Sequence, residues 1–483
     1  MPAARRPSRR RVRGPALWSA PRLADPSRLY HATDHGRPVT LEPERFGPAQ
    51  RGGGWGPFAE SFLRLNEPAL AALDVRPEVD ATAEGARVRL VPGGRTGAVP
   101  LRSAQTGHVA AGLVVRPRFG WAGVGSVLSE TGWHAAPEFL ALPLVPGSGR
   151  EVPPWVLAGP VLARLAALLR ALRRGYEDRE EILRRPRGRI LWGQYASQLL
   201  PHGRWDKLPC RFPDLGTDPR LKRTVRWAIE RIRRDLVAIG GRDPVATSLT
   251  WLADRLIELL HDVRPEEPRR DELRVALGPG RAGAEALRRG IEAVGWIVDE
   301  RGLGGGREQD GLAWQLPLDR LWEGYVESVV RREAAQVGGE VKTGRLGETT
   351  FPIRWSQPAQ GSLGKLVPDL VVRRGRELRI VDAKYKAHLA ELGEQGWHRF
   401  ADDSRDAHRA DVHQLLAYAA LYEAEEITAT LIYPLRRETY EALRERGRDV
   451  ARAELSHGGR RLTLELRGLA FGPGRILQSQ AGS

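Results

Sequence analysis

Cysteine is almost absent from this chain, with Cys210 the single example among 483 residues. One thiol cannot build a disulfide framework, a cysteine zinc finger or a four-cysteine iron–sulfur cluster. Such sparing use of cysteine is typical of a cytoplasmic protein, and we expect Cys210 to be a buried, inert thiol.

Long apolar runs and a nucleotide-binding loop are also missing. No stretch of roughly 20 uninterrupted apolar residues occurs, and no apolar signal-peptide core follows the arginine-rich start. We therefore expect no membrane-spanning segment and predict a disordered basic tail over residues 1–25. The P-loop pattern G-x-x-x-x-G-K-[ST] is absent, so we expect this chain to bind no nucleotide triphosphate by that route.

Lysine is scarce although the chain is strongly basic. Lysine and arginine together number 76 against 60 acidic residues, a formal net charge of +16, yet only six of the 76 are lysines. The charge favours a polyanionic partner such as nucleic acid or an acidic membrane surface, and a compositional bias toward arginine explains it equally well. Half of the lysines fall at 365–386. Because lysine is a compact charge whose pKa responds to its neighbours, this segment is a candidate for chemistry on a phosphate.

Length and patterning predict a multidomain α+β protein. A chain of 483 residues exceeds one ordinary core, so we expect two or three domains. Short apolar runs alternating with Gly and Pro at 87–144 predict a β-rich N-terminal domain over 26–155. Within it, Trp121 is either part of a partner-facing loop or, as is commoner, a buried aromatic beside turns. Apolar residues at helical spacing at 161–174, 218–239 and 244–263 predict a helical middle domain over 156–310.

Basic and aromatic residues alternate within the middle domain. Trp192 and Tyr195 follow a basic run closely. Arginines beside aromatics can hold a phosphate backbone and stack on bases, so this run is a candidate DNA contact. A solvated helix end followed by a core strand explains the same residues. The candidate DNA-binding arginines are Arg184, Arg185, Arg187 and Arg189.

The segment 311–483 has a definite order of predicted elements. A helix over 318–336 carries Glu323 and Glu327 one turn apart on one face. Two strand-like runs follow, and 366–386 predicts a hairpin that turns at Arg374 and Gly375. A second helix over 411–423 and a strand over 426–434 complete the order.

Two aspartates of the predicted hairpin suit a metal site. Asp369 and Asp382 fall on adjacent strands, and Mg²⁺ prefers oxygen ligands. Lys384 is two residues after Asp382, so both side chains project from the same face of the strand. His408 and His413 are five residues apart and point to different faces, which favours structural roles.

These residues resemble the PD-(D/E)xK nuclease motif. The match consists of Pro368-Asp369 followed by Asp382-Ala383-Lys384. The resemblance implies an α/β restriction-endonuclease-like domain over 311–483, with a mixed central sheet flanked by helices. It also assigns catalytic roles to a helical acid and to a Q-xxx-Y helix. The implied catalytic set is Asp369, Asp382, Lys384, Glu323, Gln414 and Tyr418.

The order of domains is similar, more narrowly, to the McrC-type subunit of modification-dependent McrBC restriction systems. This resemblance implies a DNA endonuclease subunit of an anti-phage defence system that works with a separate AAA+ GTPase motor, docked on the β-rich domain. It implies Mg²⁺, with Mn²⁺ as the alternative, held by Asp369, Asp382, the Ala383 carbonyl and Glu323. Lys384 would stabilise charge on the phosphate, and Lys386 would be a flanking DNA contact.

Two other functions remain open from the sequence. One is a stand-alone RecB-like or repair nuclease, although the four-cysteine cluster of some relatives is absent. The other is a non-catalytic, DNA-binding and motor-activating subunit with a vestigial nuclease fold. The intact Asp369, Asp382 and Lys384 argue against this second alternative.

Overall fold

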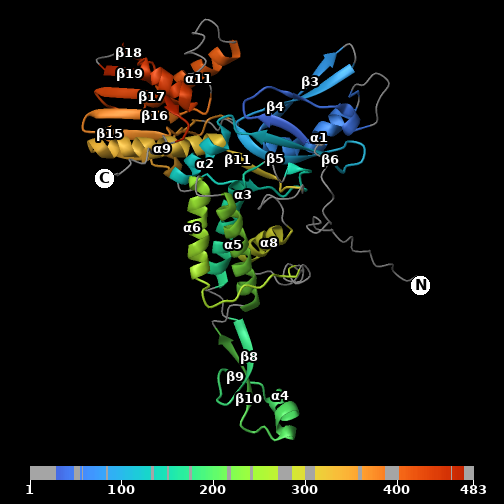
Figure 1. Cartoon of the computed structure of the whole chain (residues 1–483). Coiled ribbons are helices and arrows are strands. Elements are labelled where there is room, and N and C mark those ends of the chain that lie inside the picture. Colours follow the sequence, from blue (N-terminus) through green and yellow to red (C-terminus); the bar gives the residue numbers. More distant parts are fainter. Residues whose placement is uncertain are drawn as a thin grey trace, which may run out of the picture.

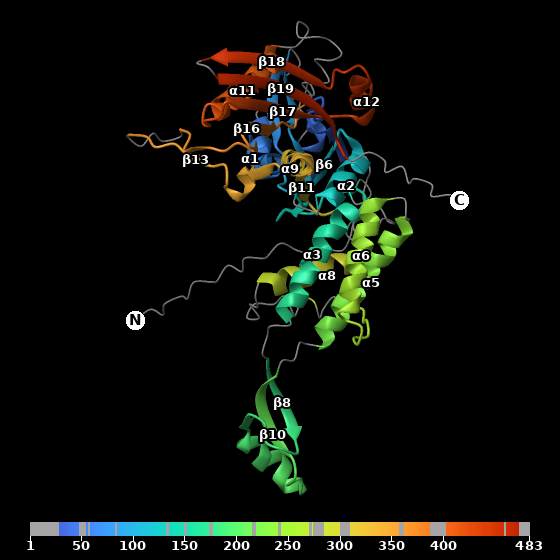
Figure 2. The ribbon, with the colours of Figure 1, turned by 90° about the vertical axis from the view of Figure 1, so that its left-hand side faces the viewer.

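The computed structural model shows two adjoining sheet-containing parts, a helical stalk and an arm at the far end of the stalk (Figure 1). A view turned by 90° gives the same arrangement (Figure 2). The predicted basic tail at 1–25 lies outside the described residues. The structure describes residues 29–47, 55–56, 58–82, 85–131, 135–148, 152–172, 177–214, 219–239, 243–269, 273, 285–299, 310–356, 362–386, 402–457 and 460–472.

The N-terminal part is rich in strands, as its alternation of apolar runs and turns predicts. A five-stranded sheet has the order β1-β6-β5-β11-β7, and a three-stranded sheet has the order β2-β4-β3. A core that includes Phe46, Trp55 and Phe62 packs within this part. Its elements are β1 (Leu29–Thr33), β2 (Val39–Thr40), a 3-10 turn (Pro43–Arg45), α1 (Phe58–Ala72), β3 (Val75–Thr82), β4 (Gly85–Pro92), β5 (Arg95–Arg102), β6 (Val109–Arg116), α2 (Gly120–Glu130) and β7 (Glu138–Phe139).

The sequence predicts strands and turns over 87–144, but residues Gly120–Glu130 form helix α2 instead. Its glycines indicate close packing instead of turns: a Cβ atom on Gly125 would lie 2.9 Å from the ring of Trp155. Val124, Val127 and Leu128 are buried at helical spacing. Trp121 packs edge-on against the ring of Trp155, so it is a packed aromatic on a helix.

Four helices form the stalk, and a small three-stranded sheet forms the arm. By length and composition α3 is, of the described helices, the one that could cross a membrane, but 61% of its most apolar window is buried inside the protein. It packs against α5, α6 and α8, as a core helix does. The elements are α3 (Pro154–Leu172), β8 (Glu177–Leu183), β9 (Arg189–Ile190), α4 (Trp192–Gln194), a π turn (Tyr195–Leu199), a 3-10 turn (Leu200–His202), β10 (Leu208–Asp214), α5 (Pro219–Ile239), α6 (Pro244–Glu258) and α8 (Glu285–Val298).

After the stalk the chain returns to the N-terminal sheet before it enters the C-terminal one. Strand β11 (Trp314–Pro317) pairs antiparallel with β5 and with β7. The C-terminal domain is predicted to begin at residue 311, but β11, which follows this residue, still belongs to the N-terminal sheet. Helix α9 (Leu318–Val337) begins directly after β11, so one continuous segment joins the two sheets.

The C-terminal part contains a mixed six-stranded sheet with the order β12-β15-β16-β17-β19-β18. Strands β16, β17 and β19 are parallel to one another, and the remaining pairs are antiparallel. The chain is thus a multidomain α+β protein, as predicted. The elements after α9 are β12 (Glu340–Thr343), a 3-10 turn (Gly344–Leu346), β13 (Phe351–Pro352), β14 (Lys365–Leu366), β15 (Leu370–Arg374), β16 (Glu377–Ala383), α11 (Asp402–Ala419), β17 (Glu426–Leu435), α12 (Arg437–Glu445), β18 (Val450–His457) and β19 (Arg460–Ala470).

Alternate residues of β16 enter two different cores. Leu378 and Ile380 pack in a cluster with Leu415 of α11. Val381 and Ala383 join a larger cluster that also contains residues of α9, the stalk and the N-terminal sheet. Because side chains of a strand alternate between faces, α11 and α9 cover opposite faces of this sheet.

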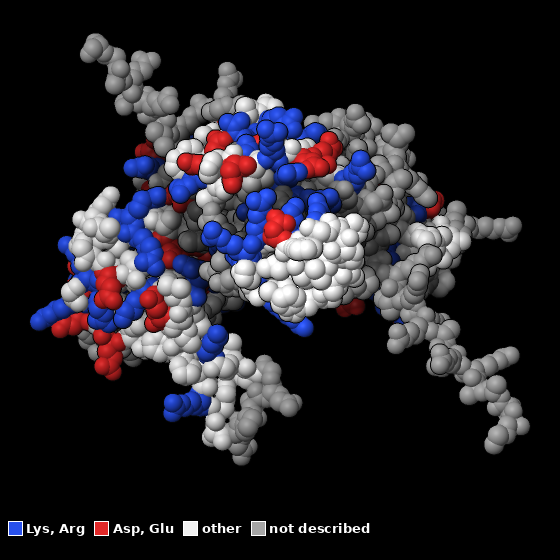
Figure 3. All heavy atoms as spheres, turned by 90° about the horizontal axis from the view of Figure 1, so that it is seen from below, with Lys and Arg blue, Asp and Glu red and all other residues white. Residues whose placement is uncertain are grey.

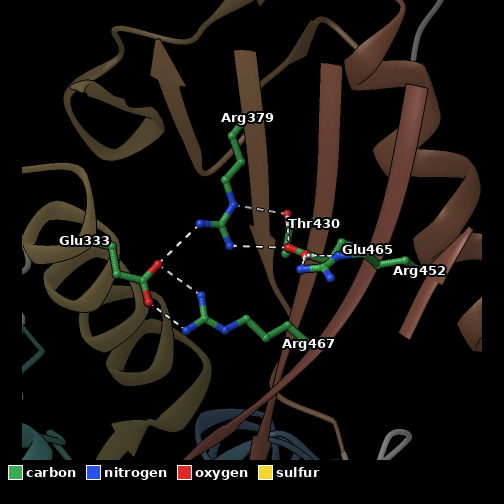
Figure 4. A network of polar contacts seen from close by, with 6 residues as sticks. All are labelled: Glu333, Arg379, Thr430, Arg452, Glu465 and Arg467. Atoms are coloured by element: carbon green, nitrogen blue, oxygen red, sulfur yellow. Dashed lines mark hydrogen bonds and ion pairs between the residues drawn. The ribbon is translucent and has the colours of Figure 1, made fainter. Parts of the chain in front are cut away.

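A network of ion pairs joins the C-terminal half of α9 to its face of the sheet (Figure 4). Glu333 of α9 contacts the guanidinium groups of Arg379 and Arg467. On the neighbouring strands, Glu465 is 7% exposed and accepts hydrogen bonds from Thr430 and Arg452. The network links the helix to four strands, β16, β17, β18 and β19.

We predict that Glu465→Ala will lower the free energy of unfolding by about 2 kcal/mol, because the buried Thr430 hydroxyl and the partly buried Arg379 each lose a charged acceptor, while Arg379 keeps Glu333. Differential scanning calorimetry of the full chain measures the change. Glu426→Ala is the matched control, since Glu426 is on the same sheet but pairs with Arg461 at the surface. Equal effects of the two substitutions would contradict a stabilising network.

Candidate active site

The hairpin of β15 and β16 places two carboxylates at one end of the C-terminal sheet. Leu370 pairs with Val381, and Gly375 turns the chain between the strands with a φ of +57°. Asp369 directly precedes β15, and Asp382 is near the end of β16. The two carboxylates are close enough to interact directly.

Asp369, Asp382 and Lys384 come together, as the motif order predicts. The main-chain N–H of Ala383 donates a 2.8 Å hydrogen bond to Oδ2 of Asp369. The Lys384 ammonium lies 2.7 Å from Oδ2 of Asp382, a side chain with 2% exposure. This contact is poorly aligned, and among the described residues that buried oxygen has no hydrogen-bond partner.

Helix α11 holds the lysine from the other side. Nζ of Lys384 donates to Oε1 of Gln414 at 2.9 Å. Nε2 of Gln414 donates in turn to the Tyr418 hydroxyl at 2.7 Å. Gln414 and Tyr418 are one helical turn apart and face the same way. They therefore fix the direction of the ammonium group.

Helix α9 contributes Glu323 near its N-terminal end. The neighbouring Trp322 is fully buried, and its indole N–H donates to the Ile432 carbonyl, which fixes the helix over the sheet. Glu323 is exposed, but the protein atoms around its carboxyl raise its pKa, and Asp319 and Asp382 raise it further, to about 7. Glu323 therefore belongs electrostatically to the aspartate pair.

The electrostatics of this group favour a bound cation. Burial, Asp382 and Glu323 raise the pKa of Asp369 well above its usual range. Burial also raises the pKa of Asp382, against the lowering effect of Lys384. Burial alone would lower the pKa of Lys384, but Asp382 offsets this and raises it. Three acidic groups thus share one ammonium, and further positive charge would relieve their repulsion.

The donor set is compatible with Mg²⁺ but is not a complete protein cage. Among the described residues, no group of three His, Cys, Asp or Glu side chains is arranged to hold a metal by itself. Mg²⁺ usually keeps several waters and needs only one or two carboxylates. Asp369 and Asp382, which are adjacent on the hairpin and buried, meet that requirement.

Lys386 has a protein partner of its own. Its ammonium donates to both carboxylate oxygens of Asp411, at 2.8 and 2.9 Å, and Asp411 is buried in the middle of α11, one turn before Gln414. The pair ties the end of β16 to α11. No local pattern predicts this pair, because Asp411 is 25 residues away from Lys386. His408 is buried beside the Tyr433 hydroxyl, which fits the structural role expected for it.

The four arginines predicted to contact DNA are exposed, but the structure does not bring them to this site. They lie on the arm, at the opposite end of the stalk from the C-terminal sheet in both views. The guanidinium of Arg187 stacks on Phe212, and Arg184 pairs with Asp206. Cys210 of the arm is buried, as expected.

The arm also exposes large apolar side chains. Trp192 and Trp205 are 62% and 72% exposed. In the view from below, a broad uncharged area faces the viewer and basic side chains border it (Figure 3). Whether the arm arginines contact DNA stays a prediction.

Fold and site together define a multidomain α+β protein with a carboxylate–lysine centre at one end of a mixed sheet. Residues 156–434 match the model of the family described as "McrBC 5-methylcytosine restriction system component". The chain belongs to this family, which confirms the resemblance to McrC-type components of restriction systems.

A chain in the "Cryo-EM structure of the Thermococcus gammatolerans McrBC complex" is similar at 15% identity, with a TM-score of 0.24, over 63% of this chain and 87% of that one. A comparison with curated protein sequences found no match.

We predict that Glu323→Gln will stabilise the metal-free protein at pH 8. The folded pKa of about 7 exceeds the ordinary value of 4.5, so the Glu323 contribution to stability falls as pH rises from 4.5 to 7. Solvent screening of its exposed edge limits the gain at pH 8 to about 1 kcal/mol.

Urea unfolding with a chelator at pH 5 and pH 8 measures this difference. The variant and the wild type should be nearly equal at pH 5. Glu377→Gln, at the exposed start of β16, is the control and should match the wild type at both values. A variant less stable than the wild type at pH 8 would contradict the electrostatic interpretation.

Proposed function

We propose that the chain is the metal-dependent DNA endonuclease subunit of a cytoplasmic restriction system, and that its C-terminal domain has the PD-(D/E)xK fold. The observation that carries this proposal is the convergence of Asp369, Asp382 and Lys384 at one end of a mixed sheet, with Gln414 and Tyr418 supporting the lysine. The reaction would be hydrolysis of DNA phosphodiesters.

Asp369, Asp382 and the Ala383 carbonyl would hold Mg²⁺ or Mn²⁺, with Glu323 completing the set. When bound, such an ion would polarise the phosphate and lower the pKa of a water. The raised pKa values of the aspartates support this assignment, because a cation offsets the repulsion that raises them.

Lys384 would stabilise the charge that develops on the phosphate oxygens. Its pKa is raised, so it stays protonated at neutral pH and can donate to an oxyanion. Its contacts to Asp382 and Gln414 hold the ammonium in one direction. Glu323, which lies beside the aspartate pair, would complete the metal shell or hold a water.

The partner in this proposal is a separate AAA+ GTPase motor of the McrB type. Membership of a family of restriction-system components and the missing P-loop support a division of labour between this chain and a motor. The N-terminal β-rich part is the proposed docking domain, and DNA is the proposed substrate. Stimulation of GTP hydrolysis when the two proteins are mixed would test the partnership separately from cleavage.

We predict that Lys384→Arg will lose cleavage nearly as fully as Lys384→Ala, by about 10²-fold or more. The ammonium fits between Asp382 and Gln414, and its side chain is 16% exposed. The planar guanidinium is too bulky for that position. Cleavage and DNA binding should be measured together at fixed salt with Mg²⁺ present, because phosphate contacts make binding salt-dependent.

Lys386→Arg is the control for charge, since arginine can also bind the Asp411 carboxylate in a bidentate manner. We expect it to retain cleavage. The proposal fails if Lys384→Arg cuts DNA at the wild-type rate while Lys386→Arg does not. If both lysine variants cleave normally, the chemistry lies elsewhere.

We predict that Asp369→Asn and Asp382→Asn will each weaken Mn²⁺ binding by at least about tenfold, because each removes a carboxylate of the donor set. Isothermal titration calorimetry on the full chain measures this without any cleavage. Asp406→Asn, an exposed residue of α11 paired with Arg409, is the control. Unchanged Mn²⁺ affinity in both aspartate variants would rule out this metal site.

A further inference from the structure

Asp34 and Tyr385 connect the N-terminal sheet to the candidate active site. Asp34 follows β1 directly and is 1% exposed. The Tyr385 hydroxyl donates a 2.9 Å hydrogen bond to its Oδ2, across 351 positions of sequence. Tyr385 is itself 6% exposed and stands between Lys384 and Lys386.

The N-terminal side of this contact is held firmly. The main-chain N–H of Asp34 donates to the Arg116 carbonyl, so the aspartate continues the pairing of β1 with β6. Its Oδ1 accepts the main-chain N–H of Arg118 at 2.5 Å, and the Arg118 guanidinium lies 3.5 Å from Oδ2. The carboxylate therefore has little freedom to turn away from Tyr385.

The tyrosine ring is enclosed as well. The Arg118 guanidinium lies 4.6 Å from the centre of the Tyr385 ring. Phe119 and Phe471 meet the ring edge-on, at centroid separations of 5.9 and 6.0 Å. A hydroxyl and a carboxylate buried in this way are costly unless each satisfies the other, so the pair fixes where Tyr385 lies.

The position of Tyr385 determines the path of the main chain that carries both lysines. The N–H of Lys386 donates to the Lys384 carbonyl at 2.9 Å, a tight turn centred on Tyr385. Lys384 and Lys386 contact α11 on one side of this segment. Tyr385 contacts the N-terminal part on the other side. A shift of the tyrosine would therefore move the lysines.

We propose that Asp34 is a positioning residue of the nuclease centre: it holds Tyr385 and thereby orients Lys384 toward the aspartate pair. The inference rests on the proposed function, since it assigns Asp34 to the same centre. It makes the N-terminal domain a part of the centre and not only a docking module. Asp34 touches no reacting group; it acts through Tyr385.

Tyr385→Phe removes only the hydroxyl and keeps the ring packing. We expect kcat for DNA cleavage to fall by about 10- to 100-fold, because a small misplacement of a catalytic group costs rate without weakening substrate binding. KM and DNA affinity should stay within about twofold of the wild type. Asp34→Asn should lower kcat by a similar factor. The double variant should have a kcat no lower than that of the more damaged single variant.

Tyr30→Phe is the matched control. Tyr30 is also a buried tyrosine of the N-terminal sheet, and its hydroxyl also takes part in one hydrogen bond, from the N–H of Glu42. Its ring and hydroxyl contact Arg45, Phe46 and Glu42 of the N-terminal part, so this variant should keep the wild-type kcat. The comparison separates positioning from a general loss of stability, which thermal unfolding of the four variants and the wild type would report.

A second readout needs no cleavage at all. Six lysines make a full chain labelled with ¹³Cε-lysine simple to follow by NMR, with Lys384 and Lys386 assigned from their arginine variants. Tyr385→Phe and Asp34→Asn should shift both signals, and Tyr30→Phe should shift neither. Unmoved lysine signals, or a wild-type kcat in Tyr385→Phe, would overturn the proposal. If the lysine signals move but the wild type cleaves no DNA, the positioning stands and the proposed function falls.

Discussion

Repulsion among the acidic side chains at one end of the C-terminal sheet is the constraint on which this structure depends. Asp369, Asp382 and Glu323 come from three different elements and share one ammonium. Such an arrangement persists only where the surrounding structure holds its elements in place. Favourable packing in the rest of the fold must therefore contribute more free energy than this repulsion costs.

The supports lie on every side of the centre. Glu327, one turn after Glu323, binds Arg331 and Arg345. The loop that carries Arg345 hydrogen-bonds from Gly344 to the Asp369 carbonyl, so α9 and Asp369 share one anchor. Lys386 and Asp411 fasten α11, and the large core that includes residues of β16 continues into the stalk and the N-terminal sheet.

Local patterns were enough to predict the hairpin and the residues of the centre. Strand parity places Asp382 and Lys384 on one face, and the spacing of Gln414 and Tyr418 on a helix needs no tertiary information. The helix α2 was missed because its glycines also occur in turns. Gly125 must be small because the Trp155 ring packs against it, and this contact is visible only in the structure. The family match over 156–434 is consistent with the residues that carried the resemblance.

Contacts between distant parts of the sequence could not be predicted in this way. Asp34 lies in a sequence that indicates only a loop. Its role depends on the hydrogen bond from Tyr385, which is 351 positions later in the sequence. The sequence makes the arginines of the arm a candidate DNA contact, and the structure places the arm at the opposite end of the stalk from the C-terminal sheet. Charge and aromatic content indicate what a surface can bind, but they do not show where that surface lies in the fold.

The return of β11 to the N-terminal sheet gives the stalk an unusual kind of attachment. The chain leaves this sheet after β7 and comes back in β11, and these two strands are hydrogen-bonded neighbours. Adjacent strands are about 5 Å apart, so the stalk and arm are an insertion whose two ends nearly touch. Its helices nevertheless share one continuous core with the sheets at its base, because Trp155 and Val245 of the stalk pack against Gly125 of α2. The longest projection of the fold is thus attached both by two adjacent strands and by a common core.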